Sequence, residues 1–179
     1  KPLAKAEGQD AAASDGLLPL PWSDESIDVV VSLAGVHHQE DKRPLFAEML
    51  RVTAPGGTLV LSDVAKGSAP AHFLDNFVGD HNSTGHEGVF LDDHTLEELV
   101  ESGWIVRSRK LEEFNWTFKD RMEMADFCRW LFDICKASPE QIANAVEQEL
   151  GTQTVPGGMG TTRRQAFYSS YKQCTYHRW

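Results

Sequence analysis

The sequence predicts an α/β fold built around a sheet that contains parallel strands. Two short apolar runs, residues 27–33 and 58–64, have the β-branched, nearly continuous character of strands covered on both faces. Between them, residues 44–52 place apolar side chains at helical spacing among charged ones. A strand, a helix and a second strand with short connections form the right-handed crossover unit of an α/β sheet.

The segment Ala54-Pro55-Gly56-Gly57 separates the helix from the second strand. Proline disfavours the helical region for the residue before it, and glycine leaves the backbone free to turn. We therefore expect a turn at residues 54–57, with the second strand following at once.

Helix caps mark the next elements. Asp92 or Asp93 can cap a helix that ends at Gly103, because helix starts favour acidic residues and helix ends favour glycine. Residues 104–111 are then expected to form a strand.

Two more helices are expected before the last strand. Apolar side chains at helical spacing predict one helix over residues 122–135, and the Ser-Pro-Glu-Gln sequence at 138–141 starts another that runs to Gly151. The glycine-containing segment 152–164 is expected to be a flexible loop. The alternating, aromatic segment 168–179 is expected to be the last strand.

The composition limits the class of protein. A length of 179 residues is typical of a single domain. The contents of 41% hydrophobic and 25% charged residues are ordinary for a soluble globular protein. No apolar run approaches the length that spans a bilayer, and no signal peptide is visible, although a truncated start could hide one. The three cysteines lack metal-ligand spacing, which is typical of reduced cysteines in a cytoplasmic protein.

The net charge of −10 disfavours a nucleic-acid partner. Lys and Arg cluster only at residues 107–110 and 163–164, whereas binding to nucleic acid needs phosphate-neutralising surface. The charge balance therefore favours a small or neutral ligand.

Five short motifs occur in a familiar order. They are Pro19–Pro21, Asp28–Val31, His37-His38, Glu48–Val52 and Pro55–Gly57. Together they resemble the central part of the class I S-adenosylmethionine-dependent methyltransferases of the small-molecule type. The resemblance is firm over about residues 3–64 and softer to Leu111.

This resemblance implies a Rossmann-like doubly wound sheet of the class I methyltransferase type, with an antiparallel last strand and extra helices inserted before it. Residues 1–179 would form one domain, with 66–91 and 112–165 as a lid or insertions on the side of the methyl acceptor. Residues 3–8 would end a helix and residues 10–14 would be the third strand. The family's first two strands and their glycine-rich cofactor loop would then fall outside this sequence.

Without those two strands, we expect the edge of the strand at 27–33 to be bare, and a bare apolar edge is an aggregation liability. The chain is therefore expected to be part of a longer protein, or to have this edge covered by further residues, a partner chain or a rearrangement. The chain alone is expected to bind the cofactor poorly, because half of the contacts would be absent.

The resemblance assigns the adenine end of the cofactor to Asp15, Gly16 and Leu17. Asp15 would accept a hydrogen bond from the adenine amino group, and Leu17 would pack on the adenine face. A turn-forming aspartate and a core leucine are the alternative.

A second cofactor segment is expected where the strand at 27–33 ends, at the topological switch point where open α/β sheets bind ligands. Its residues are Ser32, Leu33, Ala34 and Gly35. They would contact the methionine portion of the cofactor. Ordinary strand-exit residues are the alternative.

His37 and His38 are the candidate catalytic residues. Adjacent histidines point in different directions, so at most one can face the acceptor, where an imidazole is a suitable base or hydrogen-bond orienter. Helix capping or packing against the cofactor is the alternative.

Residues 73–87 are expected to be a loop that overlies the acceptor or is solvated. The spacing of His81, His86, Asp80 and Glu87 matches no metal site that we know, so no bound metal is expected. A set of aromatic residues is expected either to line the acceptor pocket or to belong to the core. These residues are Phe114, Trp116, Phe118, Phe127 and Trp130.

The function implied by the resemblance is in-line methyl transfer from S-adenosylmethionine to a small-molecule acceptor, with S-adenosylhomocysteine as product. Most of the catalysis would come from positioning. A binding or scaffold module that lacks the cofactor site is the alternative, and a nicotinamide-dependent oxidoreductase is disfavoured because its glycine fingerprint is absent. No membrane or nucleic-acid partner is expected, a homodimer is one option for the assembly, and the acceptor and its reacting atom stay open.

Overall fold

The structure is a computed structural model that describes residues 18–155 and 164–177. The strands are β1 (Ile27–Leu33), β2 (Thr53–Val64), β3 (Ile105–Phe118), β4 (Thr152–Val155) and β5 (Arg164–His177). The helices are α1 (Arg43–Val52), α2 (Ala69–Phe73), α3 (Gly79–His81), α4 (Asp93–Glu101), α5 (Arg121–Leu131) and α6 (Pro139–Ala145). Three short helical turns are η1 (Val36–His38), η2 (Leu74–Val78) and η3 (Val146–Leu150).

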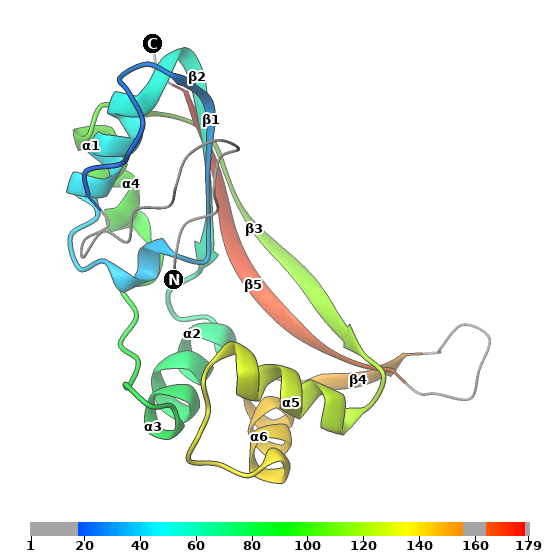
Figure 1. Cartoon of the computed structure of the whole chain (residues 1–179). Coiled ribbons are helices and arrows are strands. Elements are labelled where there is room, and N and C mark those ends of the chain that lie inside the picture. Colours follow the sequence, from blue (N-terminus) through cyan, green and yellow to red (C-terminus); the bar gives the residue numbers. More distant parts are fainter. Residues whose placement is uncertain (1–17, 156–163, 178–179) are drawn as a thin grey trace.

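One open sheet organises the described residues. Its strands follow the order β1-β2-β5-β3, with β4 paired to β5. β1 and β2 are parallel, whereas β5 runs antiparallel to β2, β3 and β4. The predicted open α/β fold is confirmed, and the carboxyl ends of β1 and β2 meet at the same edge of the sheet. Figure 1 shows α1 and α4 beside β1 and β2, with the other helices gathered beyond that edge.

The predicted crossover from β1 through α1 to β2 is present, but the predicted turn at 54–57 is wrong. These residues belong to β2, and the register against β1 shifts after Ile27, so that they bulge out of the pairing. Gly56 has a φ of +79°, and a Cβ on Gly57 would lie 2.9 Å from the carbonyl oxygen of Asp28. The Pro-Gly-Gly sequence therefore allows a bulge within the strand, where two close backbones leave no room for a side chain.

The helix predicted from its caps is confirmed as α4. The side chain of Asp92 accepts a hydrogen bond from the backbone N–H of Thr95, and the chain leaves the helix through Gly103, whose φ is +93°. The strand predicted at 104–111 is too short, because β3 pairs with β5 all the way to Phe118.

The capping sequence at 138–141 is also confirmed, since Ser138 caps α6 and η3 carries the helical path to Leu150. The preceding helix ends at Leu131, a few residues before the predicted end. In the segment predicted as a loop over 152–164, Thr152–Val155 is β4, while residues 156–163 lie outside the described part. The last strand begins at Arg164 rather than at 168, and residues 178–179 are not described.

The loop predicted over residues 73–87 is wrong in its first half. Ser68 caps α2, and η2 and α3 extend the helical path to His81. Leu74 and Val78 are buried, which explains why the segment packs as a helix rather than remaining a solvated loop.

The described residues form two separate hydrophobic cores. The crossover core lies between α1, β2 and α4, and its fully buried members include Phe46, Leu59, Leu61, Leu99 and Trp104. The helical-cluster core lies between α2, η2, α5 and α6, and its fully buried members include Phe73, Met124, Ile134 and Ile142. Among the described helices, none is long and apolar enough to cross a membrane.

Candidate active site

The chain turns sharply where β1 ends. Ala34 has a φ of +49°, and its N–H donates a hydrogen bond to the carbonyl oxygen of Ser62 on β2 over 2.8 Å. A residue with a Cβ is strained in this left-handed region, and such strain clusters at functional sites. The turn leads directly into η1, which places His37 and His38 at the carboxyl ends of β1 and β2.

The carboxylate of Asp63, at the end of β2, holds this turn in place. It is fully buried and accepts hydrogen bonds from the backbone N–H groups of Val36 (2.9 Å), His37 (3.2 Å) and Val64 (2.7 Å). The Nδ1 atom of His37 lies 2.6 Å from Asp63 Oδ1. These contacts make one carboxylate the common anchor of η1 and of the His37 ring.

The charge state of Asp63 defines the tautomer of His37. Burial by itself would raise the pKa of Asp63, but the hydrogen bonds, led by the one with His37, hold this pKa below its usual value. An ionised carboxylate can only accept, so Nδ1 of His37 carries the proton. In the neutral ring, Nε2 is then the acceptor nitrogen.

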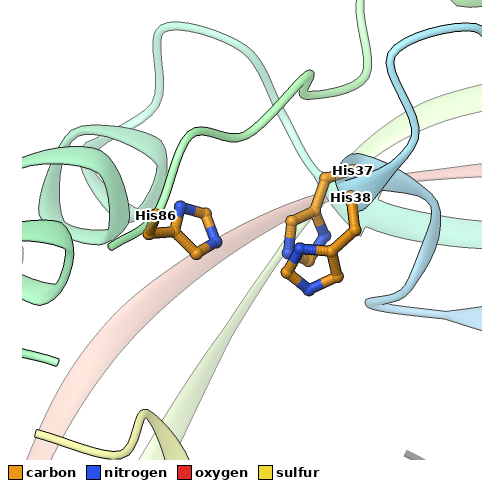
Figure 2. Close-up of side chains that lie close together, drawn as sticks. All are labelled: His37, His38 and His86. Atoms are coloured by element: carbon orange, nitrogen blue, oxygen red, sulfur yellow. The ribbon is translucent and has the colours of Figure 1, made fainter. Parts of the chain in front are cut away.

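Three imidazoles gather at this point, as Figure 2 shows. The ring centroids of His37 and His38 are 4.0 Å apart, and the centroid of His86 lies 5.5 Å from each. His86 belongs to the segment between α3 and α4, and its Nδ1 lies 2.9 Å from Oδ1 of Asp75. The N–H of Val89 donates to the carbonyl oxygen of His37 over 2.9 Å, which ties this segment to η1.

A cavity of about 730 Å³ lies beside the three histidines, and all three line it. Most of its wall is apolar, with surface from α2, η2, β3 and the end of α5. The aromatic and aliphatic part of this wall includes Phe73, Leu74, Val78, Trp116 and Phe132. Its size is within the range of small-molecule sites, and a mostly apolar wall with a few convergent polar groups is typical of them.

The predicted cofactor residues fall into three groups. Leu33 and Ala34 line the cavity. Ser32 pairs with Leu61 across the two strands, and Gly35 precedes η1; neither lies among the lining residues. The adenine residues Asp15, Gly16 and Leu17 lie outside the described part of the chain.

Of the predicted aromatic set, Trp116 lines the cavity. Phe127 packs edge-on against Trp116, with 4.8 Å between the ring centroids, and Phe118 is buried. The prediction of pocket or core is wrong for Trp130, which is 80% exposed. The side chain of Phe114 is not described.

Of the polar residues predicted near the acceptor, two line the cavity and two do not. His86 and Glu87 line the cavity. His81 turns away from it, because its ring stacks on Phe77 and its Nδ1 lies 2.8 Å from the carbonyl oxygen of that residue. Asp80 is not among the lining residues.

Sequence reasoning missed the two acidic partners, Asp63 and Asp75. A signal existed for Asp63, because it follows the apolar run of β2 directly and so lies at the strand end where ligand-binding side chains collect. No local signal identified Asp75, whose role depends on a contact with a distant segment.

Glu48 and Arg51 of α1 hold the segment that leads into β1. Glu48 Oε2 accepts a hydrogen bond from the N–H of Leu20 over 2.9 Å, and Arg51 donates to the carbonyl oxygens of Leu20 and Trp22, each over 3.0 Å. Arg51 also pairs with Asp24 at 2.6 Å. Because they lie three residues apart on one helix face, both charged side chains reach the same loop.

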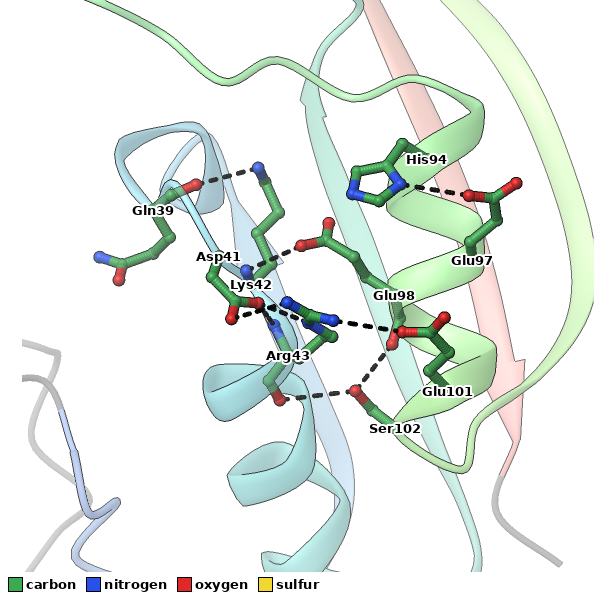
Figure 3. Close-up of polar contacts among 9 residues, drawn as sticks. All are labelled: Gln39, Asp41, Lys42, Arg43, His94, Glu97, Glu98, Glu101 and Ser102. Atoms are coloured by element: carbon green, nitrogen blue, oxygen red, sulfur yellow. Dashed lines mark hydrogen bonds and ion pairs between the residues drawn. The ribbon is translucent and has the colours of Figure 1, made fainter.

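A second polar network fixes the connection between η1 and α1 (Figure 3). Lys42 is fully buried; its Nζ donates to the carbonyl oxygen of Gln39, and its backbone N–H donates to Glu98 Oε1 of α4, each over 3.0 Å. Burial lowers the pKa of Lys42. Beside it, Arg43 lies 3.6 Å from Glu101, which adds a second link to α4.

Known proteins resemble this chain in both sequence and fold. Residues 2–61 match the family described as a methyltransferase domain. This match confirms the resemblance found in the sequence over residues 2–61, and the described residues share the α/β fold of solved methyltransferase structures.

Individual relatives match over shorter stretches. Norajmaline N-methyltransferase of Rauvolfia serpentina is 35% identical over 66 residues, which are 35% of this chain and 23% of that protein. The 27-O-demethylrifamycin SV methyltransferase of Amycolatopsis mediterranei is 39% identical over 54 residues, which are 30% of this chain and 20% of that protein. The matched region thus spans less than a quarter of either relative.

Among solved structures, the YcgJ protein of Bacillus subtilis superimposes with a TM-score of 0.56 at 14% identity, over 89% of this chain and 67% of that one.

Proposed function

We propose that this protein transfers a methyl group from S-adenosylmethionine to a small-molecule acceptor bound in the cavity beside His37. The observation that carries the proposal is the position of that cavity. It opens where β1 and β2 end, next to a strained turn and an imidazole whose orientation is fixed by a buried carboxylate.

The cofactor would lie along the exit of β1. Ser32, Leu33, Ala34 and Gly35 would approach its methionine portion, and the small side chain at Ala34 leaves space between the backbone and the cavity. Asp15, Gly16 and Leu17 would hold the adenine. They precede the loop at Leu20 that Glu48 and Arg51 tie to α1.

The acceptor would occupy the part of the cavity that the helical cluster encloses. Its aromatic and aliphatic wall favours a small, largely apolar molecule. The two relatives are named for the methylation of norajmaline and of 27-O-demethylrifamycin SV. Residues 66–91 and 112–165 supply most of this wall and would be the acceptor-side insertions of a single domain. The name of one relative specifies a nitrogen acceptor atom and the name of the other an oxygen atom, so the acceptor atom in this protein stays open.

The reaction would be an in-line displacement. A lone pair of the acceptor attacks the methyl carbon as the carbon–sulfur bond breaks, and S-adenosylhomocysteine leaves with the bonding electrons on sulfur. Holding the reactants close and aligned supplies most of the rate enhancement. Nε2 of His37 would take the acceptor's proton when the acceptor is a hydroxyl, while Asp63 keeps the ring in the required tautomer.

Calorimetric titration with S-adenosylhomocysteine tests the proposal on the full natural chain. We expect micromolar binding of one molecule per chain, weakened at least tenfold by Ala34→Leu, which fills the space at the strand exit. The matched variant Ala34→Gly keeps that space and accommodates the same φ, so it should bind as the unaltered chain does.

Transfer of an isotopically labelled methyl group to apolar amines and alcohols then tests the chemistry. Failure of the full natural chain to bind S-adenosylhomocysteine would overturn the proposal. That result would leave the alternative, a binding or scaffold module that keeps the fold without the cofactor, since fold alone does not define activity.

A further inference from the structure

We propose that His37, His38 and His86 form a binding site for one divalent transition-metal ion, with zinc as the best-fitting candidate. One ring nitrogen from each residue lies within 4.8 Å of the other two. Nitrogens in a tetrahedral zinc site lie about 2.1 Å from the metal, and therefore about 3.4 Å from one another. Movement of the exposed His38 ring, together with a small shift of the His86 ring, would close this difference. Figure 2 shows how the three rings lie relative to one another.

Carboxylates behind two of the rings support this proposal. Nδ1 of His37 lies 2.6 Å from Asp63, and Nδ1 of His86 lies 2.9 Å from Asp75. Histidines that bind metals usually donate their second ring N–H to a carboxylate or carbonyl, which fixes the tautomer and makes the ligating nitrogen more basic. In both rings this arrangement leaves Nε2 for the metal.

The backbone around His86 is also held in position without any ion. Asp75 accepts a second hydrogen bond, from the N–H of Gly88, over 2.8 Å, so the same carboxylate orients the ring and the chain beyond it. The bond from Val89 N–H to the carbonyl oxygen of His37 then joins the two ligand-bearing segments. The site therefore needs little ordering when an ion binds.

The donor set selects the class of ion. Neutral imidazoles suit zinc, copper, iron and nickel, whereas magnesium and calcium prefer oxygen ligands. Three protein ligands leave the fourth tetrahedral position open, as in catalytic zinc sites. Because all three histidines line the cavity, this position would face the molecule bound there.

An ion in this position would change the role of His37. A ring nitrogen that binds metal cannot also take a proton, so the acceptor's hydroxyl or amine would be activated by coordination, which lowers its pKa. This last step rests on the proposed methyl transfer. Binding of the ion itself does not.

Calorimetric titration with zinc chloride tests the site on the metal-stripped natural chain. We expect one ion per chain, binding at least tenfold weaker in His86→Ala, and binding weakened by roughly 10- to 100-fold in Asp75→Asn, which loses only the orienting carboxylate. His94→Ala is the matched control, because His94 is exposed on α4 and contacts Glu97. It should bind zinc as the unaltered chain does.

Circular dichroism confirms that each variant is folded, and the exposed His38 supplies an independent variant, His38→Ala, that does not disturb the buried Asp63. The proposal is overturned if the chain shows no saturable zinc binding, or if His86→Ala and His38→Ala bind zinc as tightly as His94→Ala. Neither outcome bears on the S-adenosylhomocysteine titration, so the two proposals fail separately.

Discussion

His37 and Asp63 form a buried pair in which Nδ1 of the imidazole lies 2.6 Å from Oδ1 of the carboxylate, with 7% and 0% of the two side chains exposed. The same carboxylate accepts hydrogen bonds from the backbone N–H groups of Val36 and His37 in η1 and of Val64 on β2. The orientation of the imidazole is therefore coupled to the path of the chain that leaves β1. A substitution that changes the orientation of the imidazole should therefore also change the path of the backbone between β1 and η1.

Asp63→Asn should lower kcat by roughly 10²- to 10⁴-fold while changing KM little. An amide keeps the size of the side chain but no longer fixes the proton on Nδ1, so Nε2 of His37 loses its role as acceptor. Steady-state kinetics measured with thermal unfolding separates this effect from a loss of fold. Asp93→Asn, at an exposed residue of α4, is the control, and an unchanged kcat in Asp63→Asn would rule out the orienting role.

Arg51→Ala should weaken the binding of S-adenosylhomocysteine by on the order of tenfold. Without the guanidinium, the carbonyl oxygens of Leu20 and Trp22 lose their donors, and the loop that follows the proposed adenine-binding residues is released from α1. Calorimetry measures the change in affinity. Arg109→Ala removes an exposed ion pair with Asp93 and should leave the affinity unaltered; equal affinities in both variants would contradict the prediction.

Trp104→Phe should lower the free energy of unfolding by about 2–3 kcal/mol. Trp104 is 1% exposed in the crossover core, and its Nε1 donates to the carbonyl oxygen of Phe46 over 3.0 Å, so the change leaves a void and an unpaired acceptor. Urea unfolding provides the measurement. Trp130→Phe is the matched variant, because Trp130 is 80% exposed and should tolerate the change within about 0.5 kcal/mol.

Alkaline pH should destabilise the fold through Cys128. Burial raises the pKa of this thiol from an ordinary value of 9.0 to about 12. Between these values the unfolded chain loses the thiol proton while the folded chain keeps it, so the free energy of unfolding falls as pH rises. The contribution is about 1.4 kcal/mol per pH unit over that window.

Urea unfolding as a function of pH measures this slope. Cys128→Ala should flatten it between pH 9 and pH 12, whereas Cys135→Ala, which changes an exposed cysteine, should retain it. Parallel slopes in the two variants would show that the buried thiol does not titrate as described.

Local signals in the sequence predicted the crossover unit and the helix starts. The caps at Asp92 and Ser138 depend on residues three positions away, so spacing alone reveals them. The length of β3 depends on its pairing with β5, and the bulge at 54–57 depends on the close approach of β1. No window of sequence contains these contacts.

The candidate site was predictable in part for the same reason. Leu33 ends a recognisable strand, and Ala34, His37 and His38 follow it closely; all four line the cavity. His86 reaches it only because residues 69–81 fold as helices and the chain returns to hydrogen-bond with His37. That placement is a property of tertiary packing, which periodicity does not encode.

The two hydrophobic cores share no residue, although the cavity touches elements of both. Substitutions in the helical cluster can therefore change the shape of the wall around a bound molecule while leaving the packing of α1, β2 and α4 intact. New binding preferences would then arise without a loss of the turn that holds His37. The part of the fold that holds His37 can thus stay constant while the wall of the cavity changes. This division favours both evolutionary diversification and directed redesign.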